Sequence, residues 1–130
     1  MNASNADEID AAFTALVRDC ADALLVAPDT FLASRRVQIV ILSARHLVPT
    51  MYTVREYAEV GGLISYGADV TDSVRQQGVY AGRILKGTKA ADLPVVQSTK
   101  FELAINLRTA KAIGVEVPAT LLSRADEVIE

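Results

Sequence analysis

The sequence predicts an α/β fold: three layers, with a mainly parallel sheet that carries helices on both faces. Two observations predict it. Short apolar runs typical of strands alternate with segments of helical periodicity, in the order α-β-α-β-α-β-α followed by a β-β-α-α tail. Hydrophobic residues make up 51% of the 130 residues, enough for the packed core of one domain or one lobe. Residues 1–6 are polar and are expected to be disordered or vector-derived.

The first third of the chain predicts two helices around one strand. Residues 7–20 form an amphipathic helix because apolar side chains recur at every third or fourth position, and Cys20 ends this stripe as a small core residue. Residues 23–27 are continuously apolar, which is typical of a strand covered on both faces. A second helix is predicted over residues 31–46. Its nearly all-apolar middle, residues 37–42, is expected to be buried on more than one side or to meet a partner.

The middle of the chain predicts two further strands, each followed by a helix. Residues 48–52 are the second strand, and residues 54–60 supply one or two helical turns. A glycine pair ends those turns and opens the third strand, residues 63–66. A helix capped by Asp69 follows, and basic residues and a glycine end it near residue 87.

The tail predicts two strands and two helices. Residues 93–97 surround a proline, so they are expected to be extended at a sheet edge. Residues 100–106 alternate apolar and polar side chains, as in a half-exposed strand. Asn106 caps a helix over residues 107–113 that a glycine closes, and residues 119–129 are expected to be helical.

Composition and charge exclude several classes of function. The net charge is −3, and no basic patch or polybasic run favours nucleic acid or an anionic membrane surface as a partner. One cysteine, Cys20, and one histidine, His46, are too few for an intrachain disulfide or a Cys- or His-based metal site. Nucleotide-binding and hydrolase motifs are absent, so neither a cofactor nor enzyme activity is expected. The chain as given has no membrane span and no signal peptide.

Three carboxylates stand out by their position in the predicted fold. Asp29, Glu56 and Asp69 follow or separate predicted strands, so they are expected at one end of the sheet, where ligands collect in open α/β folds. In a small enzyme, such carboxylates would serve as acid or base. Each is also explained as a helix cap or a surface charge, and binding without catalysis is the preferred interpretation.

A resemblance to a known family rests on the stretch REYAEVGGLISYG, residues 55–67. Further matching stretches cover residues 23–26, 83–87, 91–95, 99–107 and 122–129. Each stretch alone is weakly specific, but their order and spacing together resemble the ABC-type solute-binding proteins of the TrpX-like group. The resemblance covers nearly all of residues 7–130.

The resemblance implies a type I periplasmic-binding-protein fold, in which two α/β lobes close on a small molecule. Such a protein is roughly twice as long as this chain or more, so the chain is expected to be its C-terminal part only. Residues 7–60 would belong to the second lobe, residues 61–88 would return toward a missing first lobe, and residues 89–130 would form a C-terminal tail. The family implies a periplasmic or membrane-associated extracytoplasmic location. In the full-length context, its partner would be the membrane permease of an ABC transporter.

The resemblance also implies a solute site in the cleft between the lobes, and an amino acid would suit it. Its ammonium group would bind Asp29 or Glu56. Its carboxylate would bind backbone amides with Ser65 or Thr30, and its apolar side chain would pack on Tyr66. Ser65 and Tyr66 are equally explained as ordinary strand residues. The full set of expected ligand-binding residues is Asp29, Thr30, Arg55, Glu56, Ser65, Tyr66 and Asp69.

A chain without its other lobe is expected to expose strand edges and apolar faces, which associate with other chains. We therefore expect a homodimer or a higher oligomer, with residues 37–42 and 70–85 as contacts. An alternative function follows from the same expectation. The chain would then be a stand-alone oligomerisation or regulatory module, derived from such a lobe, without a transport role.

Overall fold

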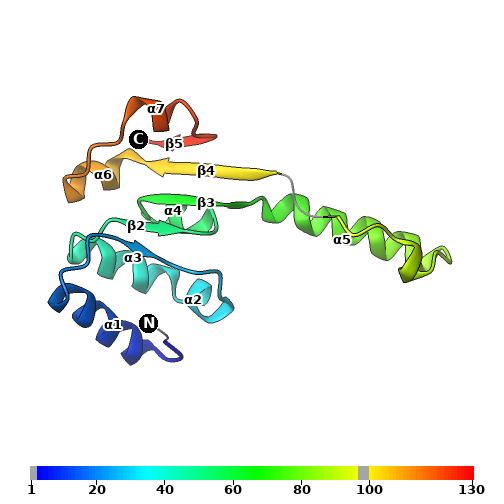
Figure 1. The fold of residues 1–130 in the computed structure, drawn as a ribbon, viewed down its shortest axis with the longest axis horizontal. Helices are drawn as coiled ribbons and strands as arrows, with labels where there is room; N and C mark the ends of the chain where they lie inside the picture. Colours follow the sequence, from blue (N-terminus) through cyan, green and yellow to red (C-terminus); the bar gives the residue numbers. More distant parts are fainter. Residues whose placement is uncertain (1–2, 97–99) are drawn as a thin grey trace. The chain divides into compact units, whose positions relative to one another are not determined.

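The computed structural model describes residues 3–96 and 100–130 as an α/β arrangement (Figure 1). This confirms the predicted fold class, an α/β fold with a mainly parallel sheet. The elements in chain order are α1 (Ala6–Arg18), β1 (Leu24–Leu25), α2 (Thr30–Ser34), α3 (Arg36–Arg45), β2 (Thr50–Tyr52), α4 (Glu56–Glu59), β3 (Ile64–Ala68), α5 (Val70–Leu85), a 3-10 turn (Ala90–Asp92), β4 (Phe101–Asn106), α6 (Leu107–Ile113), α7 (Ala119–Leu122) and β5 (Glu127–Ile129).

The strands form one sheet in the order β1-β2-β3-β4-β5. β1, β2 and β3 run parallel to one another, and so do β4 and β5. β3 and β4 run antiparallel, because Asn106 N donates to Leu63 O while Asp69 N donates to Lys100 O. The one reversal of direction therefore falls where the chain leaves the sheet after β3 and returns at β4.

The chain divides into two compact units. The larger comprises Met1–Gly67 and Glu102–Glu130, and the smaller comprises Ala68–Phe101. In the smaller unit, the Tyr80 hydroxyl of α5 donates to Pro94 O at 2.6 Å, which fastens the returning segment to the helix. Of the helices that the structure describes, none has the length and apolarity needed to cross a membrane.

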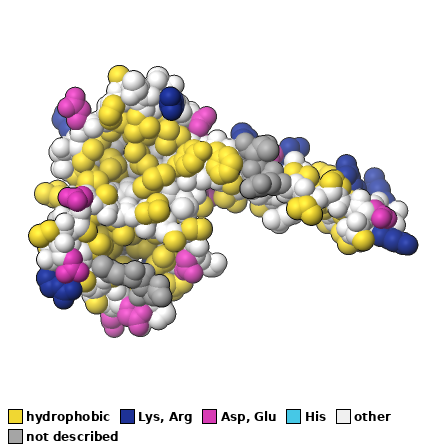
Figure 2. Space-filling view, in the orientation of Figure 1, with side chains coloured by type: hydrophobic (Ala, Val, Ile, Leu, Met, Phe, Trp, Pro, Cys, Tyr) yellow, Lys and Arg dark blue, Asp and Glu magenta, His cyan; other side chains and the backbone are white. Residues whose placement is uncertain are grey.

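The two faces of the sheet differ in burial within the larger unit. Tyr52 and Ser65 are opposite each other in the β2–β3 register, and both are fully buried. Tyr52 packs there against Tyr57 of α4. On the other face, Leu25 is 64% exposed and lies opposite Met51, which is also exposed. Figure 2 shows hydrophobic side chains gathered over the strands, so part of this face stays open in the described chain.

Helix α1 forms as the apolar periodicity predicts, but Cys20 does not join the core. The helix buries Ile9 and Phe13. Cys20 lies beyond the helix end, is exposed and has a φ of 50°, so the prediction of a core cysteine is wrong. The reason is that residue 20 takes the left-handed position that ends the helix, where Ala21 N donates to Leu16 O. The main core comprises Ile9, Phe13, Val26, Ile39, Val40, Tyr52 and Tyr57.

The single helix predicted over residues 31–46 is in fact two helices, α2 and α3, that meet at Arg35. The Ser34 hydroxyl donates to Phe31 O at 2.6 Å. Such a local side-chain bond competes with the helical ladder, and serine therefore favours a helix boundary.

The apolar middle of α3 is buried on one side only. Ile39 and Val40 enter the core, whereas Val37 and Ile41, one turn apart, are both more than half exposed. Burial on several sides, as the sequence suggested, does not occur within the described chain.

Two strands differ from their predicted burial. β1 is only two residues long and lies at the sheet edge, so the expected cover on both faces is absent at Leu25. β4 was expected to be half exposed, yet its last three residues, Ala104, Ile105 and Asn106, are all buried. Asn106 is held under α4, where its amide nitrogen donates to Ala58 O.

The tail contains a strand that the sequence did not predict. Residues 119–129 form the short helix α7 and then β5, which pairs with β4. Asp126 starts this pairing, since its backbone N donates to Leu103 O and its carboxylate accepts from Leu103 N. Residues 93–96 form no strand, contrary to the prediction, and Gln97 lies outside the described residues.

The predicted helix caps are confirmed. Asp69 caps α5 by accepting from Asp72 N, and Asn106 caps α6 by accepting from Thr109 N. Gly114 ends α6 with a φ of 74°. The predicted turns after β2 form α4.

Candidate functional site

A cavity of about 380 Å³ opens in the larger unit at the carboxyl ends of β1 and β2, the edge where open α/β sheets collect ligands. Two loops build it: one joins β1 to α2, and the other joins β2 to α4. We call it the Asp29 cavity. Its lining residues are Ala27, Pro28, Asp29, Thr30, Ala33, Thr53, Val54 and Tyr57.

Asp29 supplies the carboxylate in the described lining of the Asp29 cavity. It caps α2, because its Oδ1 accepts from Leu32 N at 2.9 Å. Among the described residues, no cation pairs with it. Thr30 follows as the first residue of α2, and both side chains are exposed. The structure thus brings these two predicted site residues together, with an oriented and unneutralised negative charge.

Tyr57 forms the aromatic part of the cavity wall. It is only 2% exposed, and its ring stacks on that of Tyr52 with the centroids 4.4 Å apart and 14° between the planes. The Tyr52 hydroxyl in turn donates to Ser43 Oγ at 3.2 Å. Burial, followed by the neighbouring Tyr52, raises the pKa of Tyr57 to about 12. The wall is therefore neutral and held in place from behind.

Arg55 lies outside the cavity lining and is engaged elsewhere. Its guanidinium lies 3.3 Å from Glu59, 3.2 Å from Glu102 and 3.0 Å from Glu127. These contacts tie α4 to β4 and β5. Glu56, the first residue of α4, is exposed and is likewise not part of the lining.

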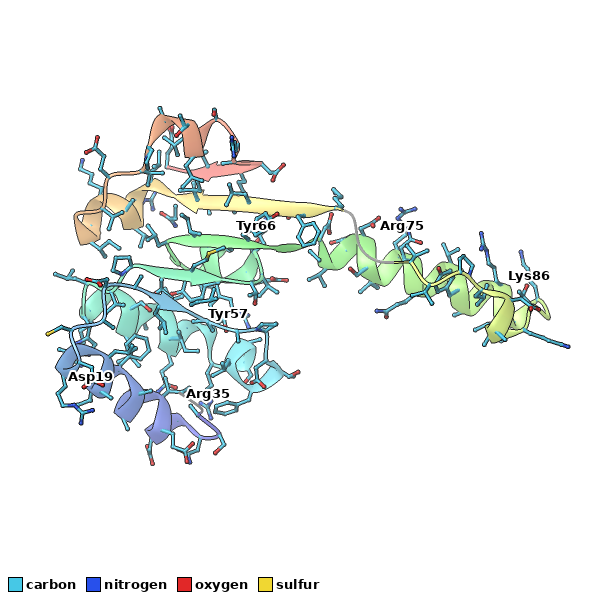
Figure 3. The ribbon with its side chains drawn as sticks, in the orientation of Figure 1. Asp19, Arg35, Tyr57, Tyr66, Arg75 and Lys86 are labelled. Atoms are coloured by element: carbon cyan, nitrogen blue, oxygen red, sulfur yellow. The ribbon has the colours of Figure 1, made fainter. Side chains whose placement is uncertain are left out.

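Ser65 and Tyr66 do not line the Asp29 cavity. They are consecutive in β3, so their side chains point to opposite faces of the sheet. Ser65 is fully buried, and its Oγ has no hydrogen-bond partner in the described part of the chain. Tyr66 is 47% exposed. Figure 3 labels Tyr57 and Tyr66, which come from α4 and β3.

Asp69 belongs to the smaller unit. Besides capping α5, its carboxylate contacts Lys100 Nζ. The hydrogen bond from Lys100, and then that from the Asp72 amide, lower the pKa of Asp69. The negative charge of Asp69 is thus already paired with Lys100 within the smaller unit.

Six lining residues are absent from the set predicted from the sequence: Ala27, Pro28, Ala33, Thr53, Val54 and Tyr57. Thr53 could have been found, because it follows the second predicted strand as Asp29 follows the first. Tyr57 carried no such signal. Its role depends on how the short α4 turns back over the sheet.

The chemistry of the cavity is that of a binding site for a small organic molecule. It combines one carboxylate, two threonine side chains and an apolar wall, a mixture typical of small-molecule sites. In the part of the chain that is described, no group of three or more His, Cys, Asp or Glu side chains could hold a metal ion.

Comparison with solved structures gives matches that cover 94% to 99% of this chain. The chain is 30% identical to an ABC domain in complex with L-Trp from Streptococcus pneumoniae. That match has a TM-score of 0.85 and covers 95% of this chain and 42% of the other. A conserved domain protein from Vibrio cholerae is 24% identical, with a TM-score of 0.86 over 94% of this chain and 41% of that one. A third match is the ligand-free, open structure of a substrate binding protein with adhesive properties from Clostridium difficile. It is 23% identical, with a TM-score of 0.67 over 99% of this chain and 43% of that one.

The chain therefore spans less than half the length of these matched structures. No protein of curated function matches the sequence. A sequence profile of ABC transporter substrate binding proteins matches residues 1–129. Because this match takes in nearly the whole chain, the chain belongs to the ABC transporter substrate binding protein family.

Proposed function

We propose that the chain is the solute-binding component of an ABC-type uptake system, or a fragment of one, and that it binds a small organic solute such as an amino acid. The observation that carries this proposal is the unneutralised carboxylate of Asp29 in an otherwise largely apolar cavity. A ligand ammonium group beside it would gain a charge-assisted hydrogen bond. The L-Trp bound to the Streptococcus pneumoniae relative supports an amino acid as the class of solute.

The other residues of the predicted site are proposed as secondary contacts. A ligand carboxylate would need hydroxyl and amide donors, and we propose Thr30 and Thr53, which line the cavity, for this role. Arg55 is a weaker candidate because three carboxylates already surround it. Further contacts proposed from the sequence are Glu56, Ser65, Tyr66 and Asp69.

Amide NMR of the 130-residue chain tests the proposal, with L-tryptophan, tryptamine and indole-3-propionate as probes. The two amines should shift the signals of residues 29–33 and 53–57, and indole-3-propionate, which lacks the amine, should not. Asp29→Asn should remove the response. Asp19→Asn is the matched control, because Asp19 is exposed and pairs with Arg18 away from the cavity lining. Equal responses to all three probes, or none to L-tryptophan, would contradict the proposal.

For a full-length protein of this family, the proposed partner is a membrane permease, and the proposed location is periplasmic or otherwise extracytoplasmic. Binding without catalysis fits this role, since the family is one of substrate-binding proteins. Secretion of the full-length gene product, followed by cell fractionation, checks the location.

We also propose self-association of the isolated chain, which is the basis of the alternative function as a stand-alone module. The exposed side chains Leu25, Val37 and Ile41 favour it, together with Val74 and Leu85 of α5. Light scattering at micromolar concentration should give at least twice the mass of 13.9 kDa. Leu25→Asp should weaken the association, and a monomer in the unchanged chain would exclude this proposal.

A further inference from the structure

Two glycines of the stretch 61–67 lie against the loop that forms one side of the Asp29 cavity. A β-carbon built on Gly67 would overlap the carbonyl oxygen of Thr53. A β-carbon on Gly62 would lie 2.7 Å from both the Tyr52 ring and the Tyr57 carbonyl oxygen. Real β-carbons essentially never come this close to a non-bonded atom, so a side chain at either position must shift these neighbouring atoms.

The displaced atoms belong to the binding surface. Thr53 and Tyr57 both line the Asp29 cavity, and Tyr52 supports the Tyr57 ring from behind. Gly62 N also donates to Tyr57 O at 2.7 Å. Gly62 therefore both lacks the side chain that would collide with Tyr57 and holds Tyr57 by a backbone hydrogen bond. The obstacles are largely backbone atoms, which cannot rotate away as a flexible side chain would.

We infer that Gly62 and Gly67 are positioning residues for the cavity: their missing side chains set how closely residues 53–57 approach the sheet. The φ angle of neither glycine lies in the left-handed region, so close approach, not backbone conformation, requires glycine there. The inference deepens the proposed function, because it concerns the same cavity, but its first tests need no ligand.

The variants are Gly62→Ala and Gly67→Ala, with Gly78→Ala and Gly82→Ala as matched controls. In both controls the new β-carbon meets nothing within 4 Å. Gly62→Ala should return the pKa of Tyr57 from about 12 toward 10, measured by absorbance titration of the phenolate. Gly67→Ala should shift the amide signals of residues 53–57. The controls should leave the tyrosine titration and those amides unchanged, and unchanged Tyr57 and loop signals in the two variants would overturn the inference.

If Gly67→Ala does not fold, the unmodified chain still gives a test. A Gly67 α-proton should show a nuclear Overhauser contact to the Thr53–Val54 backbone, and its absence would refute the close approach. A final arm uses L-tryptophan. If the unmodified chain binds it, Gly67→Ala should weaken binding at least about tenfold while Gly78→Ala does not. If the unmodified chain does not bind it, the proposed solute fails, while the titration and NMR results still decide the role of the glycines.

Discussion

The rings of Tyr52 and Tyr57 stack 4.4 Å apart inside the larger unit, so a strand residue holds a cavity-lining residue in place. The pair makes the stability of the chain sensitive to alkali. The pKa of Tyr57 is raised to about 12, mainly by burial, and that of Tyr52 is raised by the same cause.

We predict that the free energy of unfolding falls between about pH 10 and pH 12. A folded-state pKa above the unfolded value means that this stabilisation is complete below the unfolded pKa and is lost as the pH rises through the folded one. The loss should be roughly 1–3 kcal/mol. Urea unfolding at a series of pH values measures it, and Tyr57→Phe should flatten the profile. An unchanged profile in that variant would assign the effect to another group.

Ser43 and Ser65, which are both buried, should respond in opposite ways to substitution by alanine. Ser43 Oγ donates to Ile39 O and accepts from Thr50 and Tyr52. Ser43→Ala should therefore cost about 1–3 kcal/mol, because it leaves buried partners unsatisfied. Ser65 Oγ has no partner among the described residues, so Ser65→Ala should be neutral or stabilising. Chemical denaturation compares them, and a large loss from Ser65→Ala would mean that its hydroxyl is bound.

Arg55 should matter for stability more than an ordinary surface cation does. Arg55→Gln leaves Glu59, Glu102 and Glu127 without their shared counter-ion, and we expect a loss of about 1 kcal/mol that shrinks at high salt. Arg75→Gln is the matched control, since Arg75 pairs only with Asp72 in the described chain, and should cost less. Denaturation at low and high ionic strength separates the two. Equal effects would show that the network adds nothing.

Cys20 offers a route to a more stable chain. It is a non-glycine residue with a φ of 50° at a helix end, a conformation that glycine adopts without steric cost. Cys20→Gly should raise the midpoint of thermal unfolding, by the equivalent of about 0.5–1 kcal/mol. Cys20→Ala, which keeps the β-carbon, should give no gain. If both variants stabilise equally, removal of the thiol is the cause.

The sequence correctly predicts the features that depend only on neighbouring residues in the chain. Helix caps at Asp69 and Asn106 and the apolar stripe of α1 all form as expected. The predictions are wrong where tertiary contacts decide: the local sequence of residues 127–129 predicts helix, and only pairing with β4 makes them a strand.

The same division holds for the candidate site. Asp29 could be found from its place after a strand, and Thr30 came with it. Tyr57 could not be found, because its position depends on how closely α4 approaches the sheet beside Gly62. A sequence pattern contains no direct sign of such a close approach.

The antiparallel pairing of β3 and β4 also bears on how this protein can be redesigned. The register that pairs Leu63 with Asn106 puts Gly67 opposite Glu102. The two residues that flank the segment 68–101 are therefore neighbours on adjacent strands. Antiparallel neighbours can be joined by a two-residue hairpin such as Asn-Gly. Replacing residues 68–101 by that turn would shorten the loop whose closure opposes folding, and would leave the Asp29 cavity on a smaller scaffold.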